Sequence, residues 1–254
     1  KASKHGIHIF CEKPLSLKSI EVKKMIDACN QNGLILGVGH ERRFEKGWMR
    51  LKDIVTSNKL GSIMYAEGHF SHDKLAGLPS DNWRADPKFA PAAGMTGMGV
   101  HLTDLMIWLF GPVEKVFATT AKRVLDFKTG DVVTASLQHY SGLSTQITAI
   151  LKTTHYQRVT IWGENGWVEL VDSSHPDTPG PSSMKIVMND GTVEEENFEW
   201  TDTVSANIHN FIDSINGERE YLFTDVEKFQ NISVLEAIYQ SSLSKQNEKV
   251  KSFN

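Results

Sequence analysis

The feature that most constrains the fold is a change of hydrophobic periodicity part-way along the chain. Residues 7–11 and 34–39 are short apolar runs typical of buried strands, and residues 16–33 between them have helical spacing. Strand, helix and strand in that order predict a parallel βαβ unit. From residue 63 the pattern changes to many short strands, several of them joined by glycine-containing turns. The sequence therefore predicts an α/β beginning followed by an α+β remainder.

A single βαβ unit would leave both faces and both edges of its sheet exposed, whereas a doubly wound domain normally has two βαβαβ halves. We therefore expect residues 1–42 to be the C-terminal part of a dinucleotide-binding Rossmann domain, with most of that domain upstream, and residues 43–254 to form a second domain. No G-x-G-x-x-G motif follows a leading strand in the 254 residues. Taken alone, this chain is expected to bind NAD(P) weakly or not at all.

The second domain is predicted to be a large, mostly antiparallel, open-faced sheet that helices cover on one face. The expected strands are residues 63–70, 113–122, 131–140, 144–153, 157–162, 166–171, 184–188 and 192–198. The expected helices are a segment from residue 43, the segment after Gly99, residues 207–215 and residues 225–243. Six strand residues offer more apolar surface than one covered face needs: Ile147, Ala149, Leu151, Val159, Ile161 and Trp162. We therefore expect the sheet face to mediate a homodimer or homotetramer.

Charge and composition exclude several classes of protein. The formal net charge is −4 and Lys and Arg form no cluster, so a nucleic-acid partner is not expected. No apolar run approaches the roughly 18 residues that span a bilayer, so no membrane segment is expected. Two cysteines, Cys11 and Cys29, are too few for a disulfide framework, and a reduced, cytoplasmic protein is the default expectation.

Two residues stand out as candidates for chemistry. Lys13 follows a buried strand and precedes a proline, so its ammonium projects at the carboxyl edge of the sheet, where it can polarise an oxygen. His101 begins a helix after a glycine-rich loop, and its imidazole can accept a hydroxyl proton. Asp104 lies three residues further on the same side of that helix. Each also has a purely structural interpretation, namely a surface salt bridge for Lys13 and a helix-start hydrogen bond for His101.

Four motifs in order resemble the Gfo/Idh/MocA oxidoreductases, which include glucose-fructose oxidoreductase and inositol dehydrogenase. They are F-C-E-K-P-L at residues 10–15, G-H-E-R-R-F at 39–44, W-R at 83–84 followed by the glycine-rich stretch 94–111, and G-E-N-G at 163–166. The resemblance covers essentially the whole chain; the part of the family's Rossmann domain that we expect upstream has no counterpart in it. The resemblance implies a dehydrogenase that uses NAD or NADP to transfer a hydride to or from a hydroxyl carbon of a sugar or polyol, without a metal.

The resemblance also implies roles for individual residues. Lys13 and His101 are the expected catalytic pair. The expected cofactor contacts are Glu12, Lys13, Pro14, His40 and Arg42, and the expected substrate contacts are Trp83, Arg84, Asp104 and His155.

One position departs from the family pattern. In the family an aspartate often stands four residues before the histidine and shares its proton relay, but here that residue is Gly97. Asp81 and Asp86 are the loop residues that could replace it. The departure keeps two alternatives open: a sugar- or cofactor-sensing homologue without efficient redox chemistry, and an NAD-dependent glycosidase of the same fold.

Overall fold

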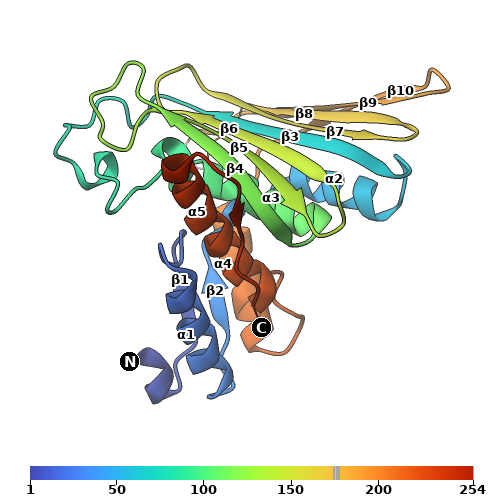
Figure 1. Cartoon of the computed structure of the whole chain (residues 1–254). Helices are drawn as coiled ribbons and strands as arrows, with labels where there is room; N and C mark the ends of the chain where they lie inside the picture. The colour runs from blue at the N-terminus through green and yellow to red at the C-terminus, as the bar shows by residue number, and fades with distance from the viewer. Residues whose placement is uncertain (174, 176–177, 254) are drawn as a thin grey trace.

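The computed structural model describes residues 1–173, 175 and 178–253, and it contains the predicted βαβ unit (Figure 1). Strand β1 (Ile9–Cys11) pairs in parallel with β2 (Leu36–Val38), and helix α1 (Ser19–Asn30) connects them. The helix begins later than expected, because the hydroxyl of Ser16 accepts the Lys18 N–H in a turn that comes before the helix. A short 3-10 helix η1 (Ala2–His5) precedes β1.

Within the described residues, a sheet of nine strands forms most of the rest of the molecule, in the order β10-β9-β8-β7-β3-β6-β5-β4-β11. Its strands are β3 (Ile63–Ser71), β4 (Val113–Ala121), β5 (Val132–His139), β6 (Ser144–Ile150), β7 (Tyr156–Gly163), β8 (Gly166–Asp172), β9 (Ser182–Met188), β10 (Val193–Phe198) and β11 (Glu248–Lys249). Neighbours are antiparallel except β3 and β6, which pair in parallel. The predicted fold class is confirmed; β11 was not predicted because two residues are too few to show alternation.

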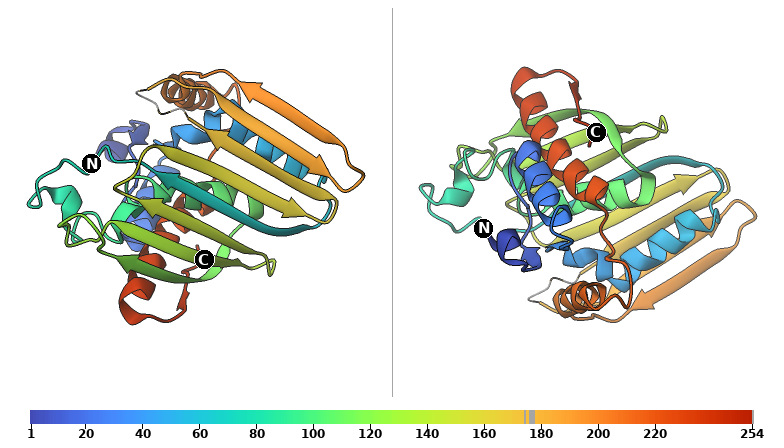
Figure 2. Two further views of the ribbon diagram at one scale, coloured as in Figure 1. Left: turned by 90° about the horizontal axis from the view of Figure 1, so that it is seen from above. Right: turned by 90° about the horizontal axis from the view of Figure 1, so that it is seen from below.

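The longer helices α2, α3, α4 and α5 lie with the βαβ unit on one face of the sheet (Figures 1 and 2). They are α2 (Lys46–Thr56), α3 (Gly99–Phe110), α4 (Thr203–Ile215) and α5 (Asp225–Ser244). The helix expected from residue 43 is in fact two, a 3-10 helix η2 (Glu41–Phe44) and α2, because Glu45 between them is extended. α3 packs against the sheet and α5, and all its residues except Phe110 are buried. A helix that is apolar on all sides is typical of this interior position.

The other face of the sheet is open (Figure 2), but most of the six residues cited for a surplus of apolar surface do not lie on it. Five of the six residues cited for it are at most 2% exposed in the core: Ile147, Ala149, Leu151, Val159 and Ile161. Trp162 lies on the open face against Tyr65, with ring centroids 5.5 Å apart, close to an ion pair of Arg158 with Glu67. That argument for a homo-oligomer was wrong, and the oligomer stays a prediction.

The C-terminal helices connect the βαβ unit to the rest of the molecule. The Lys228 ammonium of α5 donates to the carbonyl of Leu36 at 3.0 Å, and Asn207 of α4 donates to the carbonyl of Val38 at 2.9 Å. Because α4 and α5 contact both parts, the division at residue 42 also stays a prediction. Among the helices of the described residues, none is long and apolar enough to cross a membrane.

Candidate functional site

A cavity of about 650 Å³ opens between the end of β1 and the loop that precedes α3. Its lining comes from the segment after β1, from the loop around the 3-10 helix η3 (Trp83–Ala85), and from the loop around the 3-10 helix η4 (Ala93–Met95). The lining residues are Glu12, Lys13, Pro14, Ser16, Leu17, Leu75, Trp83, Arg84, Phe89, Ala93, Gly94, Thr96, Gly97 and Leu151. Five of the sequence-predicted site residues are among them: Glu12, Lys13, Pro14, Trp83 and Arg84.

Lys13 reaches the cavity because β1 ends two residues before it. Its ammonium donates a hydrogen bond to the carbonyl of Gly97 at 2.8 Å, which joins the βαβ unit to the loop before α3. Burial lowers the pKa of Lys13, and the negative charge of Glu41 opposes this shift. Lys13 is therefore a shielded donor whose position is fixed from both sides of the cavity.

His101 lies behind the cavity lining, in the first turn of α3, and is 3% exposed. Its Nε2 is 4.0 Å from Oε1 of Glu41, and within the described part of the chain its buried Nδ1 has no hydrogen-bond partner. The ring packs edge-on against His40, with centroids 5.5 Å apart. Burial holds the pKa of His101 well below its usual value, and the positive charge of Lys13 lowers it further. At neutral pH the imidazole is therefore uncharged.

The sequence reasoning placed Glu41 with His40 and Arg42 after a strand end, as a residue that could contact the cofactor, but it did not connect Glu41 with His101. Glu41 follows β2 just as Lys13 follows β1, and because these strands are parallel neighbours, their following residues meet at one edge. Its side chain is 13% exposed. Burial raises the pKa of Glu41, while the charges of Arg42 and Lys13 lower it. The signal in the sequence was an acid within the G-H-E-R-R-F motif, directly after a strand.

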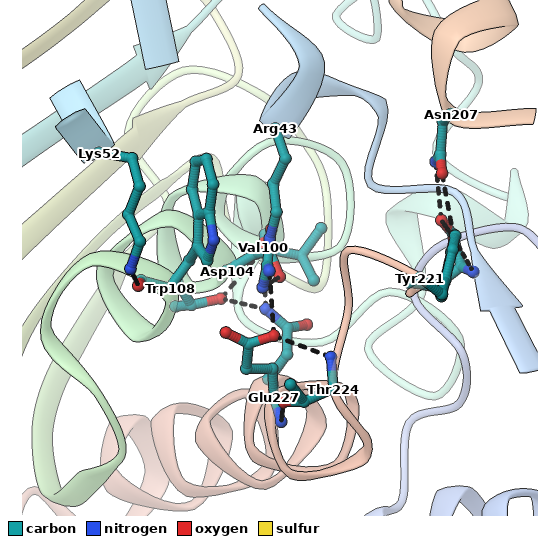
Figure 3. Close-up of polar contacts among 12 residues, drawn as sticks. Arg43, Lys52, Val100, Asp104, Trp108, Asn207, Tyr221, Thr224 and Glu227 are labelled. Atoms are coloured by element: carbon teal, nitrogen blue, oxygen red, sulfur yellow. Dashed lines mark hydrogen bonds and ion pairs between the residues drawn. The ribbon is translucent and has the colours of Figure 1, made fainter. Parts of the chain in front are cut away.

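Asp104 does not reach the cavity, because Arg43 binds both of its oxygens (Figure 3). Arg43 Nε and Nη2 donate to the carboxylate at 2.7 Å each, and Nη1 donates to Glu227 at 3.1 Å. The guanidinium also lies over the ring of Phe223, 4.3 Å from its centroid. This network of Arg43, Asp104 and Glu227 fixes η2, α3 and α5 relative to one another. From the sequence, Arg43 could equally have been a charged side chain in solvent. In the structure it is 0% exposed.

Two further contacts shown in Figure 3 fix the surroundings of the site. The Lys52 ammonium of α2 donates to the carbonyl of Trp108 at 2.6 Å, which holds the far end of α3. The Tyr221 hydroxyl donates to Asn207 at 3.0 Å and accepts the N–H of Val38 at the end of β2, also at 3.0 Å. Side-chain hydrogen bonds thus fix both the end of β2 and the C-terminal end of α3.

Three other predicted contacts also lie outside the cavity lining. His40 is 3% exposed and Arg42 is 1% exposed, so neither presents its side chain at the surface of the site. Arg42 donates to Glu45 at 2.5 Å and its guanidinium lies 4.4 Å from the centroid of the Phe70 ring. The ring nitrogen Nε2 of His155 lies 3.3 Å from the carbonyl oxygen of Asp172. The sequence placed these residues near the site, but it did not show which way they point.

The two loop aspartates do not take the place of the family acid. Neither Asp81 nor Asp86 lines the cavity; Asp81 is exposed, and Asp86 accepts the backbone N–H of Lys88 at 2.9 Å. Residue 97 itself has free space, because a Cβ there would meet only the Leu75 side chain, at 3.6 Å.

Family models match both parts of the chain. Residues 1–40 match the oxidoreductase family with an NAD-binding Rossmann fold, and residues 48–169 match the GFO/IDH/MocA C-terminal domain. Together the matches cover well over half of the 254 residues. The chain belongs to the Gfo/Idh/MocA family. The family resemblance seen in the four motifs is thereby confirmed, and NAD(P) is the cofactor of this family of oxidoreductases.

Relatives of this Gfo/Idh/MocA chain include proteins of known and unknown activity. An uncharacterized oxidoreductase of Schizosaccharomyces pombe is 34% identical over 119 residues, which are 46% of this chain and 32% of that protein. The match therefore spans about a third of that relative's length. D-xylose 1-dehydrogenase (NADP(+)) 2 of Haloferax volcanii is 25% identical over 245 residues, which are 95% of this chain and 72% of that protein.

The fold is also that of a solved structure. A putative NADPH-dependent oxidoreductase from Desulfitobacterium hafniense superposes with a TM-score of 0.88, over 98% of this chain and 74% of that one. The two sequences are 20% identical, so the likeness shows the fold and nothing about the substrate.

Proposed function

We propose that the protein is an NAD(P)-dependent oxidoreductase that transfers a hydride between a nicotinamide and a hydroxyl carbon of a sugar, polyol or related small molecule. One observation carries the proposal. Lys13 and His101 come from the two parts of the chain, yet Lys13 hydrogen-bonds the loop before α3 and lies close enough to His101 to lower its pKa. A xylose dehydrogenase among the relatives supports the substrate class.

The cavity has the size and chemistry for a planar ring beside a small polyhydroxylated ligand. Its volume of about 650 Å³ is in the range of small-molecule sites. Apolar side chains such as Leu17, Phe89 and Leu151 alternate with the charged groups of Lys13 and Arg84 around it. A nicotinamide, when bound, would supply the acceptor or donor of the hydride. Lys13 and its neighbours Glu12 and Pro14 would hold it.

The chain's own residues then have separate tasks in alcohol oxidation. Lys13 would donate a hydrogen bond to the substrate oxygen and stabilise the negative charge that develops there. His101, which its surroundings keep neutral, would accept the hydroxyl proton. Trp83 and Arg84, which stack with the guanidinium 4.2 Å from the ring centroid, would contact the rest of the sugar at the mouth of the cavity. Asp104 would act through Arg43, by holding α3 in place.

The test is turnover of NAD(P)H with a panel of sugars and polyols, measured by absorbance on the complete gene product. We expect Lys13→Met and His101→Ala each to lower kcat by about 10² to 10⁴, the usual worth of such groups. Lys52→Met is the matched control, because Lys52 is also a shielded lysine that donates to a backbone carbonyl, but outside the cavity. An undiminished rate in Lys13→Met or His101→Ala would contradict these assignments.

Gly97 favours a second candidate, a ligand-sensing homologue without efficient redox turnover. It removes the carboxylate that the family pattern places one helical turn before His101. Tight binding of cofactor or sugar by calorimetry, without turnover of any substrate in the panel, would support this candidate.

A further inference from the structure

His101 lacks a carboxylate partner on its own helix. Residue 97 has no side chain, and both oxygens of Asp104 are bound by Arg43. Within the described residues, Glu41 supplies the only carboxylate oxygen within 4.0 Å of a His101 ring nitrogen. It comes from a different element, the start of η2, which the network of Arg43, Asp104 and Glu227 holds against α3.

We propose that Glu41 takes over the task of the missing acid at residue 97: it keeps a proton on Nε2 of His101, so that Nδ1 accepts the proton of the substrate hydroxyl. The inference deepens the proposed function and rests on it. Glu41 acts through His101 and is therefore a positioning residue. Nε2 lies 4.0 Å from Oε1 of Glu41, whereas Nδ1 is buried behind the cavity lining without a partner among the described residues. The proposed task of Nδ1 therefore requires the substrate hydroxyl to reach past the lining to this atom.

Charge balance shows why His101 needs this carboxylate. The groups that face its ring and oppose an imidazolium come from three segments, and they are Lys13 after β1, His40 and Arg42 after β2, and His175 after β8. Phe70 of β3 packs against the ring and adds no charge. A proton gained by the imidazole in this setting requires a nearby negative charge, and Glu41 provides it.

The proton step is the following. The O–H bond of the substrate breaks and its proton forms the N–H bond at Nδ1, which leaves His101 as an imidazolium paired with Glu41. The electron pair left on oxygen would form the carbonyl as the carbinol C–H bond breaks, and the oxidised nicotinamide of the proposed function, when bound, would supply the hydride acceptor. The 4.0 Å separation is an ion-pair distance and is longer than a hydrogen bond, so the proposed step requires it to shorten, as catalytic hydrogen bonds often do when the ligand binds.

The first test needs no cofactor. The ¹⁵N shifts of the His101 ring at pH 7, measured on the chain by NMR, report which nitrogen carries the proton. We expect Nε2–H in the wild type and a mixture of both tautomers in Glu41→Ala. The control Glu236→Ala removes a carboxylate of similar exposure, 20% against 13%, that binds Lys251 instead, and should leave these shifts unchanged. Ring shifts that are the same in Glu41→Ala and wild type would overturn the proposal.

The second test uses kinetics of the complete gene product with a substrate from the panel. Glu41→Ala should lower kcat about tenfold or more and change KM by less than about threefold, because Glu41 does not line the cavity. Glu41→Asp should keep part of the rate. The double variant Glu41→Ala/Gly97→Asp should regain it, since a Cβ at residue 97 meets only the Leu75 side chain, at 3.6 Å. A raised KM with an unchanged kcat in Glu41→Ala would count against the proposal. So would a rate that neither Glu41→Asp nor the added Gly97→Asp restores.

The two proposals fail in different ways. If the wild type oxidises no substrate but the His101 shifts respond to Glu41→Ala, the proposed function is wrong and the pairing of Glu41 with His101 stands. If the wild type oxidises a polyol while Glu41→Ala changes neither kcat nor the ring shifts, the pairing is wrong and the proposed function stands.

Discussion

Arg43 carries its charge in the interior, and its environment explains how. The guanidinium is flanked by two carboxylates, Asp104 and Glu227, and by the ring faces of Phe223 and Trp108. A buried charge is tolerated when it is paired and hydrogen-bonded, and removal of one partner leaves the other uncompensated. Asp104 therefore matters for the shape of the site even though it does not touch the cavity.

The variant Asp104→Asn is expected to lower the free energy of unfolding by about 3 to 5 kcal/mol, because Arg43 would then be buried with half of its counter-charge. Urea denaturation measures the change. The control is Glu196→Gln, which breaks an ion pair with Arg50 whose side chains are 33% and 28% exposed, and should cost about 0 to 1 kcal/mol. If both substitutions lowered the free energy of unfolding by the same small amount, the network of Arg43, Asp104 and Glu227 would not be important for stability.

How much of the site could be predicted differs from residue to residue. Lys13, Trp83 and Arg84 line one cavity, and each could be singled out because it sits in a motif next to a strand end or turn; their roles stay predictions. Burial of Arg42 was not predicted, because a polar side chain after a strand can point either way. The proximity of Glu41 to His101 was not predicted, because it joins residues 60 positions apart and local patterns carry no information on such contacts.

At the scale of elements, the N-terminal caps of the helices explain where α5 and α4 begin. Helix α5 begins at Asp225 as predicted, because Thr224 accepts the N–H of Glu227 and the Glu227 side chain accepts the N–H of Thr224. Helix α4 begins at Thr203, earlier than the predicted 207, because Asp202 is its cap. Helix α1, by contrast, begins after the expected cap Ser16, because its N-cap is Lys18.

Loss of the α5 cap tests this point. Thr224→Ala should lower the free energy of unfolding by about 1 kcal/mol, because the Glu227 N–H then lacks its acceptor. Thr224→Ser keeps the hydroxyl and should stay close to the wild type. Urea denaturation of both variants gives the comparison, and a stability loss of the same size in the two would show that the methyl group matters instead of the cap.

At the scale of the whole molecule, periodicity was enough to predict a βαβ unit and an antiparallel sheet, but not the strand order. β3 lies between β7 and β6, so its two partners follow it in the sequence by more than 70 residues. Such pairing depends on packing over α3, which the pattern of a single strand does not show.

Buried histidines give the molecule a predicted sensitivity to acid. Burial lowers the pKa of His40 and of His72 to about 4, and holds that of His101 well below its usual value. In the unfolded chain a histidine titrates near 6.5, so between about pH 6.5 and 4 the unfolded state binds more protons. Glu41 and Glu45, whose pKa values burial raises, act in the opposite sense but are fewer.

We therefore expect the free energy of unfolding to fall as the pH drops from 6.5 towards 4. Urea denaturation at pH 7.5, 6 and 5 measures it, and His40→Phe, which removes one buried titrating group beside Phe223, should weaken the dependence. A free energy that stays constant over this range, or an unchanged dependence in the variant, would show that the histidines do not control acid stability.

The hydrogen bond from Lys13 to Gly97 has a consequence for ligand entry. An ammonium has three N–H donors, and the carbonyl of Gly97 takes one of them, so the direction of the other two is already set. A free lysine side chain loses up to about 2 kcal/mol of rotamer entropy when it becomes ordered. Here the protein has ordered it during folding, and a ligand oxygen meets a preorganised donor.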